Sequence, residues 1–340
     1  MRVKFLLLMG LVFVFHACQN INTLEPSEFS NNWQLISVNS VAAFMNRLVF
    51  IDSQTGWMIG SQGGLAKTTD GGESWNSQRS GTTKHLTDLV FINAEEGWIT
   101  GYDNTLLHTS DGGTHWQQVT VLSEDSAKHN TAIFFVDEDT GWFLNNEGDV
   151  FKTANGGDAW EKIAELDGSG WERLQFVDAS VGFATQIAGD ELMKTEDGGF
   201  TWECISLSIP NATLDIRVKD MCFISRNIGY YIYEWLSGGV MQTATPVMRT
   251  SDGGSSWTLL DSLNSPYLHT LEFVSRSTGF IAGSNCIYAT QDGGATWDIF
   301  TSQDETDFIT SLYFLEDVGW ALCSDGNVYR TYSQINKLNR

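Results

Sequence analysis

The segment Thr69-Asp70-Gly71-Gly72-Glu73-Ser74-Trp75 decides the fold, because close copies of it return along the chain. Five further copies occupy residues 110–116, 154–160, 196–202, 251–257 and 291–297. Each has two glycines and a tryptophan at fixed spacing after a short polar side chain, which is Asp70, Asp111, Asn155, Asp197, Asp252 or Asp292. Repetition at a steady period is typical of solenoids and propellers, so the chain is predicted to be a repeat protein.

A second motif lies upstream of each copy and sets the strand pattern. It is an apolar run ending in phenylalanine, then a short turn, then glycine and an aromatic residue. It occurs seven times, ending at Phe50, Phe91, Phe135, Phe176, Phe223, Phe273 and Phe314. Each unit of about forty residues therefore contains four short strands, which is the pattern of a propeller blade. This phenylalanine and Gly-aromatic motif occurs seven times, whereas the Asp-Gly-Gly segment occurs six times. The two ends of the chain explain why one Asp-Gly-Gly segment is missing.

The seventh unit ends at residues 330–333 without an Asp-Gly-Gly turn, whereas Asn32-Trp33-Gln34-Leu35 resembles the strand that follows each such turn. We therefore expect this N-terminal strand to complete the last blade, which would leave no open sheet edge. The predicted fold is all-β: one seven-bladed β-propeller of four-stranded antiparallel blades over residues 32–335, with a short tail at 336–340. The fifth unit is longer than its neighbours, with extra residues near 209–213 and 233–239.

The N-terminus has the pattern of an export signal. Arg2 and Lys4 precede an apolar run from Phe5 to Phe15 that is short for a membrane span, and Ala17-Cys18 follows. This resembles a bacterial lipoprotein signal. The interpretation makes residues 1–17 a signal peptide, Cys18 the lipidated residue, and residues 18–31 a tether. It predicts an exported protein anchored to a membrane of the cell envelope, on the periplasmic or surface side.

Charge and cysteine spacing exclude several classes of partner. The formal net charge of -23 disfavours nucleic acid and simple adhesion to anionic lipid. The cysteines at 204, 222, 286 and 323 have no CxxC spacing, so a zinc site is not predicted. No other metal and no cofactor is predicted, and the sequence leaves open whether the ring needs calcium. The pairing of the cysteines into disulfides stays open, and buried free thiols are the simpler expectation.

The repeated segment resembles the Asp-box, or BNR repeat. In that motif the carboxylate accepts hydrogen bonds from its own turn, and the tryptophan packs between sheets. All six copies are therefore predicted to be structural, and Asn155 supports this because an amide cannot act as an acid or a base. From about Trp33 to Ser333 the chain resembles the photosystem II stability/assembly factor-like propellers, often lipoproteins, whose resemblance implies a scaffold that holds a protein or peptide on one face.

Enzymes also carry Asp-boxes, so a glycan-active hydrolase is the alternative function. A sialidase needs three convergent arginines and a Tyr-Glu pair. Arg47, Arg173 and Arg217 near the starts of inner strands are the candidates for the arginines, with Arg79 on a loop, and Tyr233-Glu234 is the candidate pair. A xyloglucanase-like enzyme resembles two propellers in tandem, whereas this chain has one. Asp88 and Asp220 occupy equivalent positions near these arginines, which favours ion pairs around a central channel over a catalytic pair.

The favoured function is non-catalytic binding of a protein or peptide, with a glycan as the other ligand considered. The expected surface is the face that carries the connections between blades and the turns between second and third strands, because insertions gather there. Aromatic residues and arginine are typical interface anchors. The predicted binding residues are Arg47, Trp171, Arg173, Arg217, Tyr233, Glu234, Trp235, Tyr267 and His269.

Overall fold

The computed structural model describes residues 32–37, 43–121, 128–186, 191–207, 216–235, 244–265, 267–302, 304–315 and 317–333. The predicted signal peptide, the tether with Cys18, the tail at 336–340 and most of the fifth-unit insertions lie outside these residues. No helix in the described ranges combines the length and the apolar character needed to cross a membrane.

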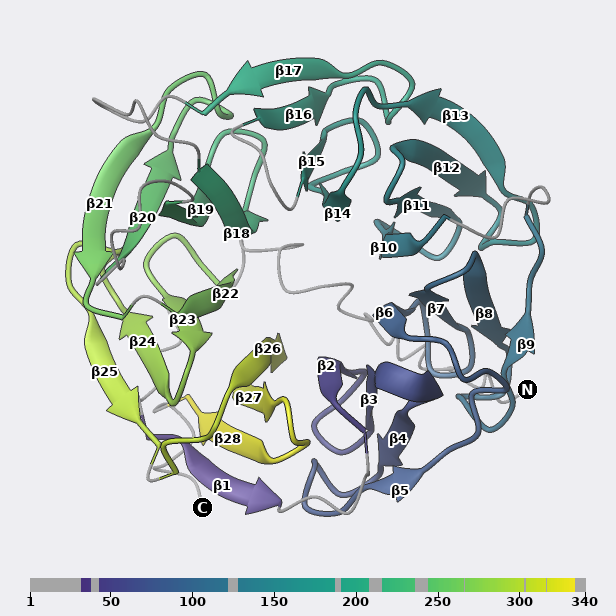
Figure 1. Cartoon of the computed structure of the whole chain (residues 1–340), viewed down its shortest axis with the longest axis horizontal. Helices are drawn as coiled ribbons and strands as arrows, with labels where there is room; N and C mark the ends of the chain where they lie inside the picture. Colours follow the sequence, from purple (N-terminus) through teal and green to yellow (C-terminus); the bar gives the residue numbers. More distant parts are fainter. Residues whose placement is uncertain are drawn as a thin grey trace, which may run out of the picture.

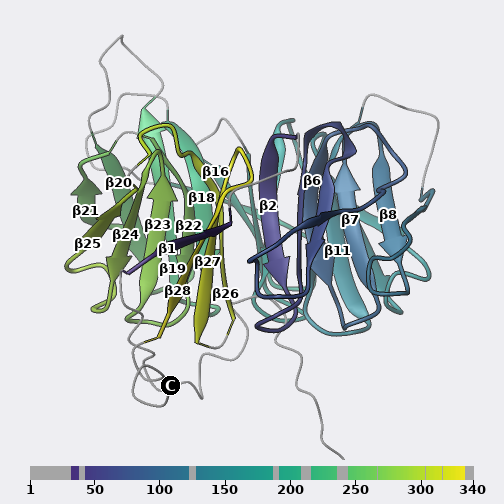
Figure 2. The same cartoon turned by 90° about the horizontal axis from the view of Figure 1, so that it is seen from below.

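The described residues form seven four-stranded antiparallel sheets, which confirms the predicted propeller. Figure 1 shows them arranged as a ring around an axis, and Figure 2 shows the inner strands running along that axis between the two flat faces. The inner strands are β2 (Met45–Phe50), β6 (Leu86–Phe91), β10 (Asn130–Phe135), β14 (Trp171–Phe176), β18 (Ile216–Phe223), β22 (Leu268–Phe273) and β26 (Ile309–Leu315). We number the blades 1 to 7 in this order.

Each inner strand ends at the repeated phenylalanine or one residue after it, and the second strand begins close to the Gly-aromatic pair. The second strands are β3 (Gly56–Gly60), β7 (Gly97–Gly101), β11 (Thr140–Asn145), β15 (Gly182–Gln186), β19 (Gly229–Trp235), β23 (Gly279–Gly283) and β27 (Val318–Cys323). The third strands are β4 (Leu65–Thr68), β8 (Thr105–Thr109), β12 (Asp149–Ala154), β16 (Glu191–Thr195), β20 (Thr245–Thr250), β24 (Cys286–Thr290) and β28 (Val328–Tyr332). A 3₁₀ turn, η1 (Ser61–Gly63), precedes β4.

The outer strands of the first six blades are β5 (Asn76–Ser77), β9 (Gln117–Gln118), β13 (Glu161–Glu165), β17 (Glu203–Ser206), β21 (Thr258–Leu263) and β25 (Asp298–Thr301). In blade 7 this place is taken by β1 (Gln34–Ser37), which pairs antiparallel with β28 and sets Gln34 opposite Arg330. Trp33 is buried against the rings of Phe280 and Phe314. The prediction that the N-terminal strand closes the last blade is confirmed.

The Phe and Gly-aromatic motifs form the contact between neighbouring blades. The Phe50 ring lies so close over Gly56 that a Cβ there would stand 2.6 Å from it. That ring stacks on Trp320 of blade 7, with centroids 3.8 Å apart, and Phe91 stacks on Trp57 in the same way. Glycine is thus required because the phenylalanine occupies the space of a side chain, and each stack buries an aromatic pair between two sheets.

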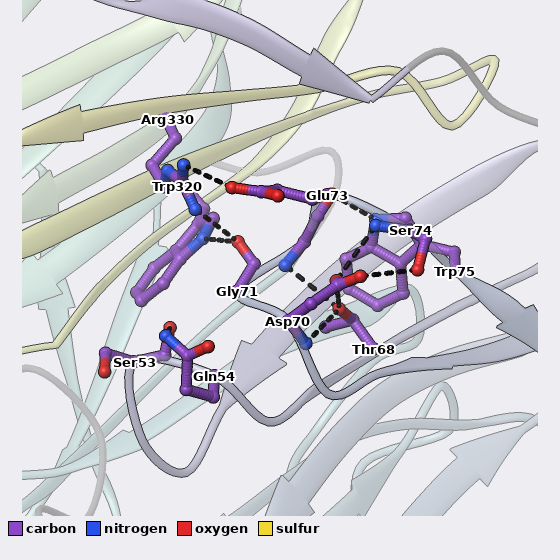
Figure 3. Close-up of polar contacts among 11 residues, drawn as sticks. Ser53, Gln54, Thr68, Asp70, Gly71, Glu73, Ser74, Trp75, Trp320 and Arg330 are labelled. Atoms are coloured by element: carbon purple, nitrogen blue, oxygen red, sulfur yellow. Dashed lines mark hydrogen bonds and ion pairs between the residues drawn. The ribbon is translucent and has the colours of Figure 1, made fainter.

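The repeated aspartate shapes its own turn, as Figure 3 shows for Asp70. One carboxylate oxygen of Asp70 accepts hydrogen bonds from Thr68 Oγ1 (2.7 Å) and from the Ser74 amide (2.9 Å). Asn155 makes the equivalent contacts through its amide oxygen, with Thr153 Oγ1 at 2.8 Å and the Ala159 amide at 3.0 Å. A neutral amide side chain therefore accepts the same hydrogen bonds and holds the turn as the aspartates do.

Four of the six turns also accept hydrogen bonds from the preceding blade, at the carbonyl groups of Gly71, Gly112, Gly156 and Gly198. Trp320 Nε1 donates to Gly71 O at 2.9 Å, and the Arg330 guanidinium reaches the same carbonyl at 3.3 Å and Glu73 at 3.2 Å (Figure 3). Trp320 and Arg330 belong to blade 7, whereas the turn belongs to blade 1. These contacts therefore join the last blade to the first, in addition to the pairing of β1 with β28. Trp142 and Lys152 hold Gly198 O similarly, at 2.9 and 3.1 Å.

Candidate functional site

The seven inner strands surround a central channel, and a bulge in each strand sets which side chains face it. In every blade the pairing with the second strand skips one residue, four positions before the repeated phenylalanine. In blade 1 this residue is Asn46, because Met45 pairs with Gly60 and Arg47 with Ile59. A bulge re-aims the side chains beside it. Residues from all seven inner strands line a cavity of about 480 Å³.

Two pairs of charged residues in the wall of this channel join neighbouring blades. Arg47 Nε lies 2.9 Å from Asp88 Oδ1, and Asp88 Oδ2 accepts the Ile133 amide at 3.1 Å. Each residue comes from a different blade, so Asp88 ties blades 1, 2 and 3 together.

The second pair repeats this arrangement three blades further on. Arg173 Nε lies 3.0 Å from Asp220 Oδ1, and Asp220 Oδ2 accepts the Leu271 amide at 2.9 Å. Asp220 therefore ties blades 4, 5 and 6 together, as Asp88 ties blades 1, 2 and 3. The ion-pair interpretation of the channel is confirmed by these contacts.

The third predicted arginine lies apart from the other two. Arg217 pairs with Glu234 at 3.1 Å, and Lys219 contacts the other oxygen of the same carboxylate, also at 3.1 Å. Arg47 and Arg173 line the channel cavity, whereas Arg217 does not. Tyr233 is 3% exposed. Each arginine thus has its own carboxylate partner, and the three do not form the shared pocket that a sialidase-like site requires.

The structure corrects two further predictions. Trp171 is only 1% exposed and packs in the core between blades 3 and 4, so its ring is not available to a ligand. Tyr233 is also packed in the hydrophobic core, so its ring is not available to a ligand either. Trp235 ends β19, and its side chain lies outside the described part of the structure.

His269 and Tyr267 do lie on the expected face. Tyr267 is 56% exposed. His269 lines the channel, packs against Phe308 with ring centroids 4.3 Å apart, and its Nε2 has no hydrogen-bond partner in the described ranges. Burial, with Lys219 and Arg173 nearby, lowers the pKa of His269 to about 4, so the ring is neutral at neutral pH.

A ring of residues around the channel mouth was missed by sequence reasoning, apart from Tyr267 and Arg217. They stand six positions before the repeated phenylalanine, where each inner strand starts. In blade order they are Phe44, His85, His129, Gly170, Arg217, Tyr267 and Phe308. Counting back from each phenylalanine would have found them. We call the face on which they lie the entry face, and the opposite one the Asp-box face.

Most of these positions carry rings. Phe44 is 51% exposed and Phe308 36%, and with Tyr267 they occupy three consecutive blades. On blades 2 and 3, Tyr102 stacks on His129 with centroids 4.1 Å apart and meets His85 edge-on at 4.9 Å. We call this set the aromatic rim: Phe44, His85, Tyr102, His129, Tyr267 and Phe308. Exposed apolar rings gathered around one opening are typical of an interaction surface.

The fold and the repeats define this chain as a seven-bladed Asp-box propeller. The family model for the photosynthesis system II assembly factor YCF48 matches residues 25–170. A "Photosystem II assembly lipoprotein Ycf48" from Picosynechococcus sp. is 40% identical over 50 residues, which are 15% of this chain and 15% of that relative's length. The resemblance stated from the sequence is confirmed over these residues, where the chain is similar to the YCF48 assembly factors.

Solved structures agree on the fold. A structure titled "YCF48 bound to D1 peptide" matches with a TM-score of 0.72 and 22% identity, over 91% of this chain and 97% of the other. An ancestral GH74 enzyme matches with a TM-score of 0.66 and 15% identity, over 88% of this chain but 46% of that enzyme. The chain therefore spans about the whole of one structure and less than half of the other.

Proposed function

We propose that this chain is a non-catalytic propeller that binds an extended segment of a protein or peptide on its entry face. The observation that carries the proposal is the exposure of Phe44, Tyr267 and Phe308 on three consecutive blades at the channel mouth. Exposed aromatic rings gain binding energy from apolar contact at a small cost in conformational entropy. The YCF48 structure bound to a D1 peptide supports a peptide as the kind of ligand.

The charged residues of the channel fit this function better than hydrolysis. Arg47, Arg173 and Arg217 already pair with carboxylates of the chain itself. A ligand carboxylate would have to displace those partners, which lowers its net gain. Arg47 and Arg173 therefore link neighbouring blades, Arg217 pairs within blade 5, and the rings supply the contact area.

We also propose that the protein acts at the cell envelope as a lipoprotein, with signal residues 1–17, a lipid on Cys18, a tether at 18–31 and the propeller at 32–335. The name of the Picosynechococcus relative, an assembly lipoprotein, supports this.

A peptide-array experiment tests the binding proposal. The full-length chain in detergent is applied to an array of 15-residue peptides from envelope proteins of its source organism. We expect a subset to bind, and the Phe44→Ala/Tyr267→Ala/Phe308→Ala variant to bind that subset at least about tenfold more weakly. The control variant, Phe200→Ala/Leu259→Ala/Ile299→Ala, removes three apolar side chains of similar exposure that lie outside the aromatic rim. Equal loss in both variants, or none in either, contradicts the proposed surface.

A further inference from the structure

Two aspartates of the described residues are buried, and they differ in whether a cationic side chain lies beside the carboxylate. Asp149 is 4% exposed, and two ammonium groups hold it: Lys128 Nζ at 2.6 Å and Lys162 Nζ at 2.5 Å. Asp307 is 3% exposed and has no ion pair with a lysine, arginine or histidine of the described ranges. A buried carboxylate is normally paired with a cation or with a metal. The contrast indicates that a positive charge belongs beside Asp307.

One oxygen of Asp307 is held in place. Oδ2 accepts hydrogen bonds from Ser302 Oγ and from Tyr329 Oη, the latter at 2.5 Å, and the two hydroxyl oxygens are 2.7 Å apart. Ser302 follows β25 of blade 6 and Tyr329 lies on β28 of blade 7. The carboxylate is therefore oriented from both blades, as ligating carboxylates are by their outer partners.

The other oxygen lacks such a donor. Asp307 Oδ1 is buried and has no hydrogen bond of standard geometry from a nitrogen or oxygen of the described residues, and the Cys323 thiol interacts with the same carboxyl group. A buried oxygen without a donor costs free energy that a bound cation would offset. This oxygen therefore points to a ligand, independently of which residues surround it.

Two further ligating groups stand next to Asp307 on the entry face. Cys323 ends β27 and is fully buried as a free thiol, and Asp325 lies in the exposed turn between β27 and β28. One ligand atom from each of Asp307, Cys323 and Asp325 lies within 4.8 Å of the others. Asp325 is held at the opening by Asn327, whose amide N and side-chain Nδ2 donate to its two oxygens at 2.9 and 2.8 Å.

We propose that Asp307, Cys323 and Asp325 bind one divalent cation of the zinc class, with water as a fourth ligand. Cys323 would bind as the thiolate after releasing its proton to solvent, and each carboxylate would contribute one oxygen. The sulfur ligand selects against calcium and magnesium, which prefer oxygen alone. Three protein ligands and an open position match the tetrahedral coordination that zinc prefers. The ligand atoms lie up to 4.8 Å from one another, and a shift of Asp325 on its exposed turn would bring them to bonding distance of one ion.

The site is particular to blade 7. The positions equivalent to Cys323 in the other blades, three residues after the aromatic of the Gly-aromatic pair, are Gly60, Gly101, Asn145, Gln186, Tyr233 and Gly283. A thiol at this place is therefore not demanded by the repeat. Asp307 comes from the connection between blades 6 and 7, and Cys323 and Asp325 come from the hairpin between β27 and β28. The ligands are therefore not arranged in a CxxC motif that could be recognised in the sequence.

A metal-uptake experiment on the full-length chain tests the proposal. The protein is stripped with a chelator and dialysed against zinc, and bound metal is measured by mass spectrometry. Cadmium is then titrated while the ultraviolet thiolate-to-cadmium absorption is followed. We expect one equivalent of zinc, and a cadmium-thiolate band that Cys323→Ser abolishes. Cys286→Ser, another buried thiol, is the control that keeps both signals.

A second variant covers the case in which Cys323→Ser folds poorly. Asp325→Asn changes an exposed side chain, and we expect it to weaken zinc binding at least about tenfold. Asp304→Asn, at a nearby exposed aspartate whose carboxylate binds Thr306, is its control and should bind as the wild type does. No zinc uptake, or equal uptake by wild type and Asp325→Asn, overturns the proposal and leaves Asp307 as a carboxyl group that meets the thiol alone.

Discussion

The Arg47 guanidinium and the Asp88 carboxylate lie 2.9 Å apart across the boundary between the first and second blades. The second oxygen of Asp88 binds the Ile133 amide of the third blade. One side chain thus connects three sheets that share no strand pairing. The same arrangement around Asp220 suggests that both carboxylates stabilise the ring by linking blades, not by strengthening any one of them.

The first prediction follows from this double use of Asp88. Asp88→Ala should lower the free energy of unfolding by about 2–4 kcal/mol, because it leaves a partly buried guanidinium without its counter-charge and an amide without an acceptor. Urea denaturation followed by tryptophan fluorescence measures this. Asp52→Ala, at an exposed turn outside the channel, is the comparison, with a smaller expected loss. A loss under about 0.5 kcal/mol for Asp88→Ala would show that the link is not stabilising.

The second prediction concerns ring closure by β1. Trp33 is 4% exposed and meets Phe280 and Phe314 edge-on, with centroids 6.0 and 5.9 Å away. Trp33→Ala should therefore cost about 3–5 kcal/mol in unfolding free energy. Deletion of residues 1–31 should leave the melting temperature unchanged, whereas deletion of 1–37 should lower it strongly. Equal melting temperatures for the two truncated chains would contradict a closing role for β1.

Much of the fold could be predicted from the sequence because its determinants are local and repeated. Phe50, Gly56 and the Asp70 turn fit together by contact between near neighbours, and seven repetitions remove ambiguity. Even the closing strand was visible, since Trp33 resembles the other outer-strand starts. Repetition of this kind specifies the blades but says little about what distinguishes them.

The site could be predicted only in part, for a physical reason. Trp171 and Tyr267 look alike as aromatic residues near strand starts, but they lie one register position apart, at five and six residues before the phenylalanine. One step in an extended strand reverses the side-chain direction, so Trp171 enters the core and Tyr267 faces solvent. Asp307 and Cys323 come from different turns, and their proximity depends on the closed ring.

The third prediction uses the Asp-box carboxylates. Hydrogen bonds from Thr296 to Asp292 lower the pKa of that carboxyl to about 2. Burial alone would raise the pKa of Asp197, but the bonds from Thr201 and its neighbours lower it to about 2 as well. The unfolded chain binds protons near the ordinary carboxyl pKa, so this stabilisation is complete above about pH 4 and is lost as the pH falls toward 2.

The measurement is the pH dependence of the unfolding free energy between pH 5 and 2. Asp292→Asn should be less stable than the wild type at pH 5 but decline less steeply on acidification, because its turn no longer titrates. Asn155 is the natural example of such a turn, and Asn155→Asp should steepen the decline. An identical slope for all three proteins would mean that these turns do not contribute to acid unfolding.

The last prediction separates surface from core among the aromatic residues proposed for binding. Tyr267→Ala removes a ring that is 56% exposed, so it should weaken peptide binding and leave the unfolding free energy within about 0.5 kcal/mol of the wild type. Trp171→Ala removes a ring that is 1% exposed, so it should cost about 3–5 kcal/mol in stability. In conditions where both variants stay folded, Trp171→Ala should retain the wild-type peptide affinity. Binding that is lost in Trp171→Ala but kept in Tyr267→Ala would place the ligand away from the aromatic rim.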